Sequence, residues 1–250
     1  MRQALRIVAT GLVLAGLTGT VQAADQKDVH AILDKAIKSM GGEKALAKHR
    51  TMTWITSGTY YGMGGDGIEF RANYALQLPD KYRFEINNLM FSMTFVVNGN
   101  HGWVKTNGET HDLSKDDLVP AHQNLYLDRL TTLLLLKRQG YELSALGESK
   151  VGDHDVVGIK VVHKGHPTAK MYFDKKSGRL VAVDARVKQS PQEGGNEVDQ
   201  RSIYSDYKDI NGVPFPTRLT ILRDNNKFVE GETSNVQFVK ELPAKDFEKP

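Results

Sequence analysis

A leucine-rich segment, set among strand-like stretches, most constrains what this chain can fold into. Residues 125–136 contain seven leucines. At 100° per residue these leucines are spread all round a helix instead of along one stripe, and such a helix must be enclosed. The segment is too short to span a bilayer, which takes about 20 apolar residues. We therefore expect a curved sheet around this helix, with an interior that is either solid core or a cavity for lipid.

The first 23 residues have the features of a secretory signal peptide. Two arginines lie near the N-terminus, residues 7–16 are apolar, and Val21-Gln22-Ala23 fits a small-x-Ala cleavage site. The apolar run is short and broken by glycine, and no cysteine follows it, so neither a membrane anchor nor a bacterial lipid anchor is expected. We predict cleavage after Ala23 and export to the periplasm, which leaves residues 24–250 as a single mature domain.

Composition narrows the classes of function for the mature chain. Removing the leader takes away two of the 33 basic residues and leaves 31 of them against 30 acidic ones. This near-neutral charge, without a basic block, does not favour nucleic-acid binding. The absence of cysteine excludes disulfides, a thiol nucleophile, iron–sulfur clusters and cysteine-rich zinc sites. The fold must therefore be held by packing alone.

The hydrophobic pattern near the start of the mature chain is helical. Hydrophobic residues recur at helical spacing over 29–40, which predicts an amphipathic helix that begins at Asp28 and ends at Gly41. A short second helix is expected over 43–49.

From Thr51 the hydrophobic period changes to two. Hydrophobic and polar residues alternate over 51–113 and again over 141–239, without a Pro-, Ser- or Gly-rich linker. This pattern predicts one antiparallel sheet with one buried face. Between the two regions, we expect Pro120 to separate a short turn from the leucine helix, and Gly140 to end that helix.

Four stretches, each mainly a turn signature, carry a resemblance to a known family. They are Leu78–Phe84, Val97–Trp103, Tyr172–Val181 and Tyr204–Pro216. With the order of leader, helix, strands, apolar helix and further strands, the chain resembles the LolA/LolB lipoprotein-carrier superfamily, especially its exported outer membrane lipoprotein-sorting protein-like members. The resemblance implies a mainly β (α+β) fold, a single curved antiparallel sheet that forms an incompletely closed β-barrel with helices plugging its concave face. It also implies an apolar cavity between helices and sheet.

The chain departs from the family at one position. In the well-studied carrier an arginine precedes the proline of the first of these turns, ties the helical lid shut and is needed for cargo release. Leu78 stands at the matching position here. The resemblance therefore implies a lipid-binding fold without that release mechanism.

The hydrophobic faces of the predicted strands and helix supply the candidate binding residues. They are Trp54, Phe70, Tyr74, Tyr82, Phe84, Phe95, Leu130 and Leu134. A cavity lined by them would bury an acyl chain at about 0.8 kcal/mol per methylene, on the order of 10 kcal/mol for roughly 14–16 carbons before entropic costs. The same side chains can also form an ordinary core, so both interpretations stay open.

No motif indicates a metal, a cofactor or an enzyme. The His and Asp groups at 153–155 and 163–166 place their side chains on opposite strand faces or across a turn, whereas zinc needs three or four convergent ligands. The chain has no G-x-S-x-G or H-E-x-x-H motif. A hydrolase with unrecognised carboxylates would need three or more titratable groups converging in the cavity.

Together these features predict a periplasmic carrier or chaperone that binds a lipid or a lipoprotein acyl chain and exchanges it with a membrane-associated donor or acceptor protein. The alternative on the same fold is a non-enzymatic envelope sensor or protein-interaction module with a solid core. No cofactor, nucleic-acid partner or transmembrane segment is expected in the mature chain. Whether space is left between the leucine helix and the sheet decides between the two hypotheses.

Overall fold

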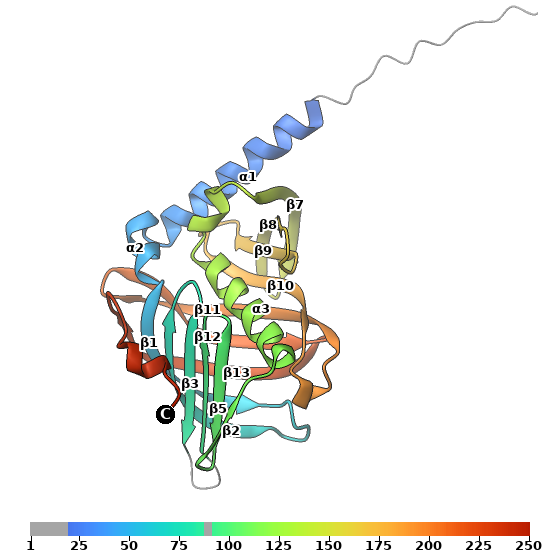
Figure 1. Ribbon diagram of the computed structural model, residues 1–250. Coiled ribbons are helices and arrows are strands. Elements are labelled where there is room, and N and C mark those ends of the chain that lie inside the picture. The colour runs from blue at the N-terminus through green and yellow to red at the C-terminus, as the bar shows by residue number, and fades with distance from the viewer. Residues whose placement is uncertain (1–19, 88–91) are drawn as a thin grey trace, which may run out of the picture.

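A single antiparallel sheet dominates the structure. The computed structural model describes residues 20–87 and 92–250 (Figure 1). The strands are β1 (Thr51–Tyr60), β2 (Ile68–Gln77), β3 (Lys81–Asn87), β4 (Ser92–Asn98), β5 (His101–Thr106), β6 (Glu109–Asp112), β7 (Tyr141–Val151), β8 (His154–His163), β9 (Ala169–Asp174), β10 (Leu180–Lys188), β11 (Glu197–Ile210), β12 (Val213–Arg223) and β13 (Asn226–Phe238). Their order is β6-β5-β4-β3-β2-β1-β13-β12-β11-β10-β9-β8-β7. The sheet does not close, which confirms the predicted mainly β, incompletely closed architecture.

Three α-helices accompany the sheet: α1 (Thr20–Ser39), α2 (Gly42–Lys48) and α3 (Lys115–Thr131). Short 3-10 turns are η1 (Leu134–Lys137), η2 (Pro191–Glu193) and η3 (Ala244–Phe247). Helix α3 and η1 connect the two edge strands β6 and β7, and α3 lies across the concave side of the sheet (Figure 1). Helices α1 and α2 lie at one end of it. Among the described residues, no helix is both long and apolar enough to cross a membrane.

The first helix is longer than its hydrophobic pattern predicts. It begins at Thr20, so Asp28 lies inside α1 and not at its N-terminus. Residues 20–27 contain neither glycine nor proline, so nothing in them ends a helix. The predicted end is confirmed, because Gly41 has a φ of 86°. The leader prediction falls on residues 1–19, which lie outside the described part of the chain, and on the first turn of α1.

The prediction of one continuous leucine helix was wrong at both ends. Helix α3 begins at Lys115, where the Ser114 hydroxyl accepts the Asp117 N–H at 3.2 Å and the Asp117 carboxylate accepts the Ser114 N–H at 3.0 Å. It continues through Pro120. Proline lacks the N–H that would have bonded to the carbonyl of Asp116. Because Asp116 is exposed, water can hydrogen-bond to that carbonyl instead.

The helix ends before most of the leucines. The hydroxyls of Thr131 and Thr132 donate to the carbonyls of Asp128 and Arg129, each at 2.7 Å. Such bonds compete with continued helix. Leu133 then takes a φ of 60°, and the next leucines form the separate turn η1. The leucines therefore belong to two elements, α3 and η1, and not to one helix.

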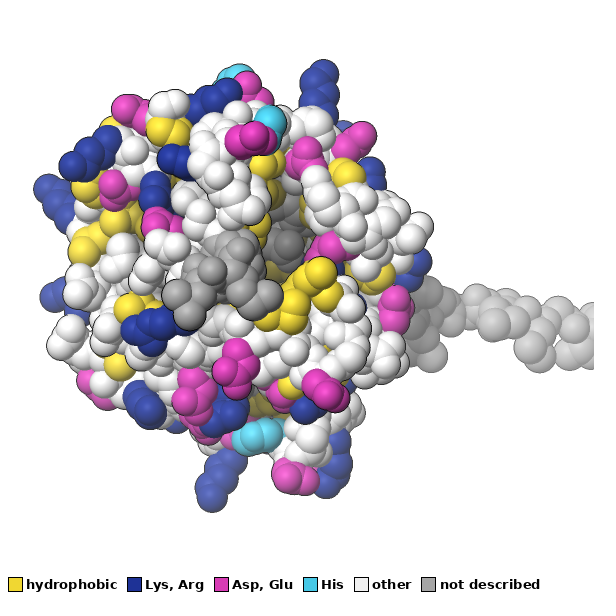
Figure 2. All heavy atoms as spheres, turned by 90° about the horizontal axis from the view of Figure 1, so that it is seen from below, with side chains coloured by type: hydrophobic (Ala, Val, Ile, Leu, Met, Phe, Trp, Pro, Cys, Tyr) yellow, Lys and Arg dark blue, Asp and Glu magenta, His cyan; other side chains and the backbone are white. Residues whose placement is uncertain are grey.

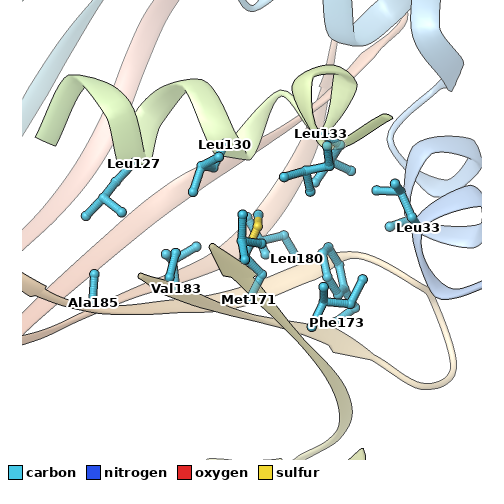
Figure 3. Packing of buried hydrophobic residues seen from close by; sticks show 14 of the residues in the cluster. Leu33, Leu127, Leu130, Leu133, Met171, Phe173, Leu180, Val183 and Ala185 are labelled. Carbon is cyan, nitrogen blue, oxygen red and sulfur yellow. The ribbon is translucent and has the colours of Figure 1, made fainter. Parts of the chain in front are cut away.

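Helix α3 divides the interior into two unlike parts. On one side lies a region that we call the solid core, formed by α1, α3, η1 and β8–β11 (Figure 3). Its members include Leu33, Leu130, Leu133, Met171 and Phe173, each at most 1% exposed. On the other side, Leu118 and Leu125 of α3 face β1, β2 and β4.

Shortening one fully buried side chain of the solid core should strongly lower the stability of the protein. Leu130→Ala should lower the free energy of unfolding by about 2–5 kcal/mol, because it leaves a cavity in a fully buried site. Urea unfolding followed by circular dichroism measures this. Val119→Ala, at a 39% exposed position of the same helix, should change it by less than about 0.5 kcal/mol. Equal effects of the two substitutions would contradict this description of α3.

Candidate functional site

An aromatic row crosses the concave side of the first four strands. Trp54, Tyr74, Phe84 and Phe95 are successive cross-strand partners on β1, β2, β3 and β4. The centroids of neighbouring rings are 5.0, 6.0 and 5.5 Å apart. Tyr82, two residues before Phe84, lies 6.2 Å from Tyr74 and 6.1 Å from Phe84. We call these five side chains the aromatic wall.

The other three predicted binding residues lie elsewhere. Phe70 is on the same face of β2 but opposite Gly58, outside the row. Leu130 is part of the solid core and is fully buried. Leu134 packs against that core from η1. The structure therefore groups the predicted aromatic residues other than Phe70, and separates them from the two leucines.

Two glycines leave the middle of the concave face without side chains. Gly58 of β1 pairs directly with Gly231 of β13, and both lie on the face that carries the aromatic wall. A Cβ on Gly58 would collide with the backbone of Glu230. The cross-strand row through this pair continues to Leu219 on β12. A Cβ on Gly231 would in turn collide with the side chain of Thr56, so the glycine pair lets β1 and β13 approach each other closely beside the wall.

The aromatic wall faces inward but is not fully covered. Each of its side chains keeps part of its accessible surface, whereas the solid core leaves almost none. Yet burial raises the pKa of Tyr74 to about 12, and burial also raises the pKa of Tyr82 well above its usual value. The protein's own side chains therefore cover the wall only in part. Figure 2, seen from the end opposite α1 and α2, shows a central hollow with hydrophobic side chains around it.

We call the space between α3 and this part of the sheet the trough. His49, just after α2, is buried near it, stacks on Phe238 at 5.4 Å and meets Phe215 edge-on at 5.6 Å. Burial lowers the pKa of His49 to about 4, so the imidazole is neutral at physiological pH. All three rings are neutral groups, and they belong to or border the hydrophobic cluster between α3 and the first strands.

The sequence analysis missed one carboxyl group on α3 whose pKa is strongly shifted. Asp128 of α3 shares a helix face with Ala121 and Leu125, which pack toward the aromatic side. Burial raises the pKa of Asp128 to about 7. The carboxylate in turn contributes to the raised pKa values of Tyr82 on β3 and Tyr204 on β11, after burial itself. It therefore lies between the two halves of the sheet.

Within the described residues, the charge of Asp128 has no partner. Among the described residues, no hydrogen bond or ion pair to its carboxylate is found, and burial alone accounts for the shift of its pKa. The sequence does contain a signal for this residue. Asp128 is an acidic residue inside a leucine-rich segment, and it lies three residues after Leu125 of the buried face. Tyr204 carried no comparable signal, because its approach to Asp128 depends on the curvature of the sheet.

Side-chain hydrogen bonds hold α3 across the sheet. His122 donates a ring N–H to the carbonyl of Gly99 at 2.8 Å, on the β4–β5 turn. The side-chain oxygen of Gln123 accepts the N–H of Lys188 on β10 at 2.7 Å. Leu78, at the position of the family's arginine, is instead buried among hydrophobic residues of the α3–sheet contact. The helix is thus fixed to both halves of the sheet without an arginine at that position.

Of the histidines considered as metal ligands, His154 pairs with Asp174 at 3.2 Å, whereas His163 and His166 belong to a ring stack. Tyr141, His163, His166 and Tyr126 follow one another with centroids 4.4, 4.8 and 4.2 Å apart. Within the described ranges, no three His, Asp or Glu side chains converge in a way that could hold a metal ion. The stack lies on the solid-core side, away from the aromatic wall.

Two open depressions are found among the described residues. One of about 410 Å³ is lined by Asn73, Arg83 and Gln237, next to Asp246 of η3, and its lining also includes Trp54 and Tyr74 of the aromatic wall. Another of about 520 Å³ lies beside α2 and the end of β13. Their linings mix polar and hydrophobic residues, without a cluster of groups suited to catalysis.

Comparisons with known proteins define the fold. No protein-family model matches the chain, and no curated protein matches it. A LolA superfamily protein from Nitrosomonas europaea aligns over 88% of this chain and 97% of its own, with 13% identity and a TM-score of 0.56. A putative outer membrane lipoprotein-sorting protein domain from Vibrio parahaemolyticus aligns over 86% and 97%, with 12% identity and a TM-score of 0.52. A DUF1329 family protein from Desulfovibrio piger aligns over 88% of this chain and 97% of its own, with 15% identity and a TM-score of 0.57. The chain therefore has a LolA-like fold.

The buried carboxyl makes a testable contribution to stability. The pKa of Asp128 is about 7 in the folded state and 3.8 in its unperturbed form. At a pH between these two values, the folded state therefore keeps a proton that the unfolded state has lost. Stability contributed by this site therefore falls as pH rises from about 4 to about 7. Asp128→Asn should be nearly neutral at pH 4 and stabilising by up to about 4 kcal/mol at pH 8. Urea unfolding at a series of pH values measures the difference.

The control for this measurement is Asp116→Asn, which changes an exposed carboxylate on the same helix. It should show no such rise between pH 4 and pH 8. A gain for Asp128→Asn that does not vary with pH would mean that the carboxyl titrates normally.

Proposed function

We propose that this protein is an exported, non-enzymatic carrier that holds the acyl chain of a lipid or of a lipoprotein in the trough. The observation that carries the proposal is the aromatic wall, which faces inward and is only partly covered by the protein's own side chains. Burying hydrocarbon against it gains about 0.8 kcal/mol per methylene, and no specific polar contact is needed. The signal-peptide features of the first 23 residues support export.

The fold supports the same class of function. Two of the similar structures are described as a LolA superfamily protein and a putative outer membrane lipoprotein-sorting protein domain. Their likeness to this chain extends over 88% and 86% of its length. A membrane-associated donor or acceptor protein is the partner that such a carrier would require.

One observation bears on a hydrolase. Asp128 contributes to the raised pKa values of Tyr82 and Tyr204, but only Tyr82 belongs to the aromatic wall, whereas Tyr204 packs against the solid core. Burial raises the pKa of both phenols, so neither is a base or a nucleophile near neutral pH. Glycoside hydrolysis needs two carboxyl groups about 5–10 Å apart, whereas only Asp128 is found here among the described residues. We therefore propose no catalytic role for these groups.

The two tryptophans provide a built-in test of where an acyl chain lies. Trp54 belongs to the aromatic wall, whereas Trp103 packs on the outer face, where its N–H donates to the carbonyl of Phe247 at 3.4 Å. A brominated fatty acid quenches only nearby indoles. It should saturably quench the fluorescence of Trp103→Phe, which retains Trp54, and leave Trp54→Phe, which retains Trp103, unaffected.

Circular dichroism of both variants gives the control for folding. If neither tryptophan is quenched, the carrier proposal fails, and equal quenching of both would indicate adsorption to the surface. A solid trough and a tight protein partner in pull-down would favour the interaction module instead.

The length of the acyl chain should set affinity. If each added methylene is fully buried, the dissociation constant should fall about fourfold per carbon from 10 to about 14 carbons, and then level off where the trough ends. Competition against the brominated fatty acid measures this series. Affinity independent of chain length would contradict binding of the tail.

A further inference from the structure

An arginine is enclosed between α3 and the sheet. The Nε of Arg223 on β12 donates to the side-chain oxygen of Gln200 on β11 at 3.3 Å. Gln200 is buried and donates in turn to the side-chain oxygen of Asn124 on α3 at 3.2 Å. Because α3 lies across the concave side of the sheet (Figure 1), these two bonds place the guanidinium of Arg223 on that side. Its side chain is only 12% exposed, so the positive charge is largely enclosed by protein.

Two aromatic rings and one carboxylate surround this guanidinium at the end of β1. The central carbon of the guanidinium lies 3.5 Å from the ring centroid of Phe228, and that ring meets Tyr60 edge-on at 5.1 Å. Nη1 of Arg223 lies 3.0 Å from the carboxylate of Glu193 in η2, to which the Tyr60 hydroxyl donates at 3.4 Å. The arginine is therefore held in one position before a ligand arrives, which lowers the entropic cost of binding to it.

The guanidinium of Arg223 keeps an unused donor. Within the described residues, its buried Nη1 has no hydrogen-bond partner, because the contact with Glu193 is an ion pair without the alignment of a hydrogen bond. On the opposite face of the same strand, Arg218 holds two carboxylates, those of Asp206 and Glu232. A guanidinium can also bind one carboxylate or phosphate through two parallel hydrogen bonds. In the described part of the chain Arg223 holds one carboxylate, so a second anion can bind there as part of a ligand.

Hydrophobic side chains connect this arginine with the aromatic wall. Tyr60 and Trp54 lie on the same face of β1, six residues apart, which is roughly 20 Å along an antiparallel strand. The cross-strand row between them carries Phe70 on β2 and Leu219 on β12. A hydrocarbon tail whose headgroup lies at Arg223 can therefore run along this face toward the aromatic wall.

We propose that the trough selects amphiphiles with an anionic headgroup, a carboxylate or a phosphate, which Arg223 binds while the hydrocarbon tail runs along the aromatic wall. The inference rests on the proposed function, because it assigns a headgroup class to the same site. It adds a specificity that hydrocarbon burial cannot supply, since burial of a tail does not distinguish one headgroup from another. The carboxylate of Glu193 competes with the headgroup for the guanidinium and so weakens its binding.

The experiment compares ligands with the same tail. Tetradecanoate, tetradecyl phosphate, tetradecanol and tetradecylamine compete, below their micelle concentrations, with a brominated fatty alcohol that quenches Trp54 in the Trp103→Phe background. At pH 8 the two anions should bind about tenfold more tightly than the alcohol, because hydrogen bonds between charged groups are stronger than those of a neutral hydroxyl. The amine should bind more weakly than the alcohol, since the guanidinium repels it.

Two substitutions at the site should act in opposite directions. Arg223→Gln should remove the preference for the anions, so that they bind no better than the alcohol. Glu193→Gln should strengthen the binding of both anions, because it removes the competing carboxylate. An ion pair with a purely structural role would instead weaken binding of every ligand in both variants. Arg218→Gln, on the other face of β12, is the matched control and should keep the preference.

Free anions are tested separately from amphiphiles. Millimolar inorganic phosphate should leave the preference for the tetradecyl anions unchanged, because it gains nothing from burial of a tail. If it abolishes the preference, Arg223 binds a free anion and the inference is overturned. Circular dichroism checks the folding of each variant, and the gain expected for Glu193→Gln cannot arise from unfolding.

The outcomes separate this inference from the proposed function. If the anions and the alcohol bind equally, or if the amine binds best, anion selection is overturned and the carrier function stands. If no tetradecyl compound competes, the carrier function itself fails. A preference that survives Arg223→Gln, or a weaker binding of the anions by Glu193→Gln, overturns the assignment to Arg223.

Discussion

The position of α3 against both halves of the sheet is the constraint on which the structure depends. The helix and η1 join the two edge strands, so the chain has to cross the concave side between β6 and β7. Leu118 and Leu125 pack toward the first strands, and Leu127 and Leu130 pack toward the last ones. Hydrogen bonds from His122 and Gln123 add fixed points at the β4–β5 turn and at β10. Because the helix is apolar in two directions, it both covers the sheet and divides its interior.

The two parts of the interior differ in how completely they are filled. The solid core brings α1 against the concave face of β8–β10, so aliphatic side chains from three layers interdigitate and exclude solvent (Figure 3). In the described part of the chain no second helix covers β1–β4 in the same way, and the rings of the aromatic wall there keep part of their accessible surface. A carrier needs this combination: one part supplies the stability, and the other can remain open to a ligand.

The aromatic wall could be predicted because strand alternation fixes which residues share a face. Trp54, Tyr74, Phe84 and Phe95 each follow the two-residue period, and the register of adjacent hairpins places them side by side. Leu130 and Leu134 could not be assigned in this way, because which half of the interior a helical residue enters depends on how the helix is rotated. Asp128 was missed for the same reason: only the packed orientation of α3 decides where its carboxyl lies.

The sequence by itself determined the strands, their antiparallel pairing and the apolar faces, because a period of two and short turns leave few alternatives. It also determined that a helix must cross an enclosed space, since a leucine-rich segment this apolar is not stable in water. Tertiary structure alone decided where the leucine segment breaks, which half of the interior becomes solid, and that Asp128 contributes to the raised pKa values of Tyr82 and Tyr204. These outcomes depend on contacts between residues far apart in the chain, and local periodicity carries no information about such contacts.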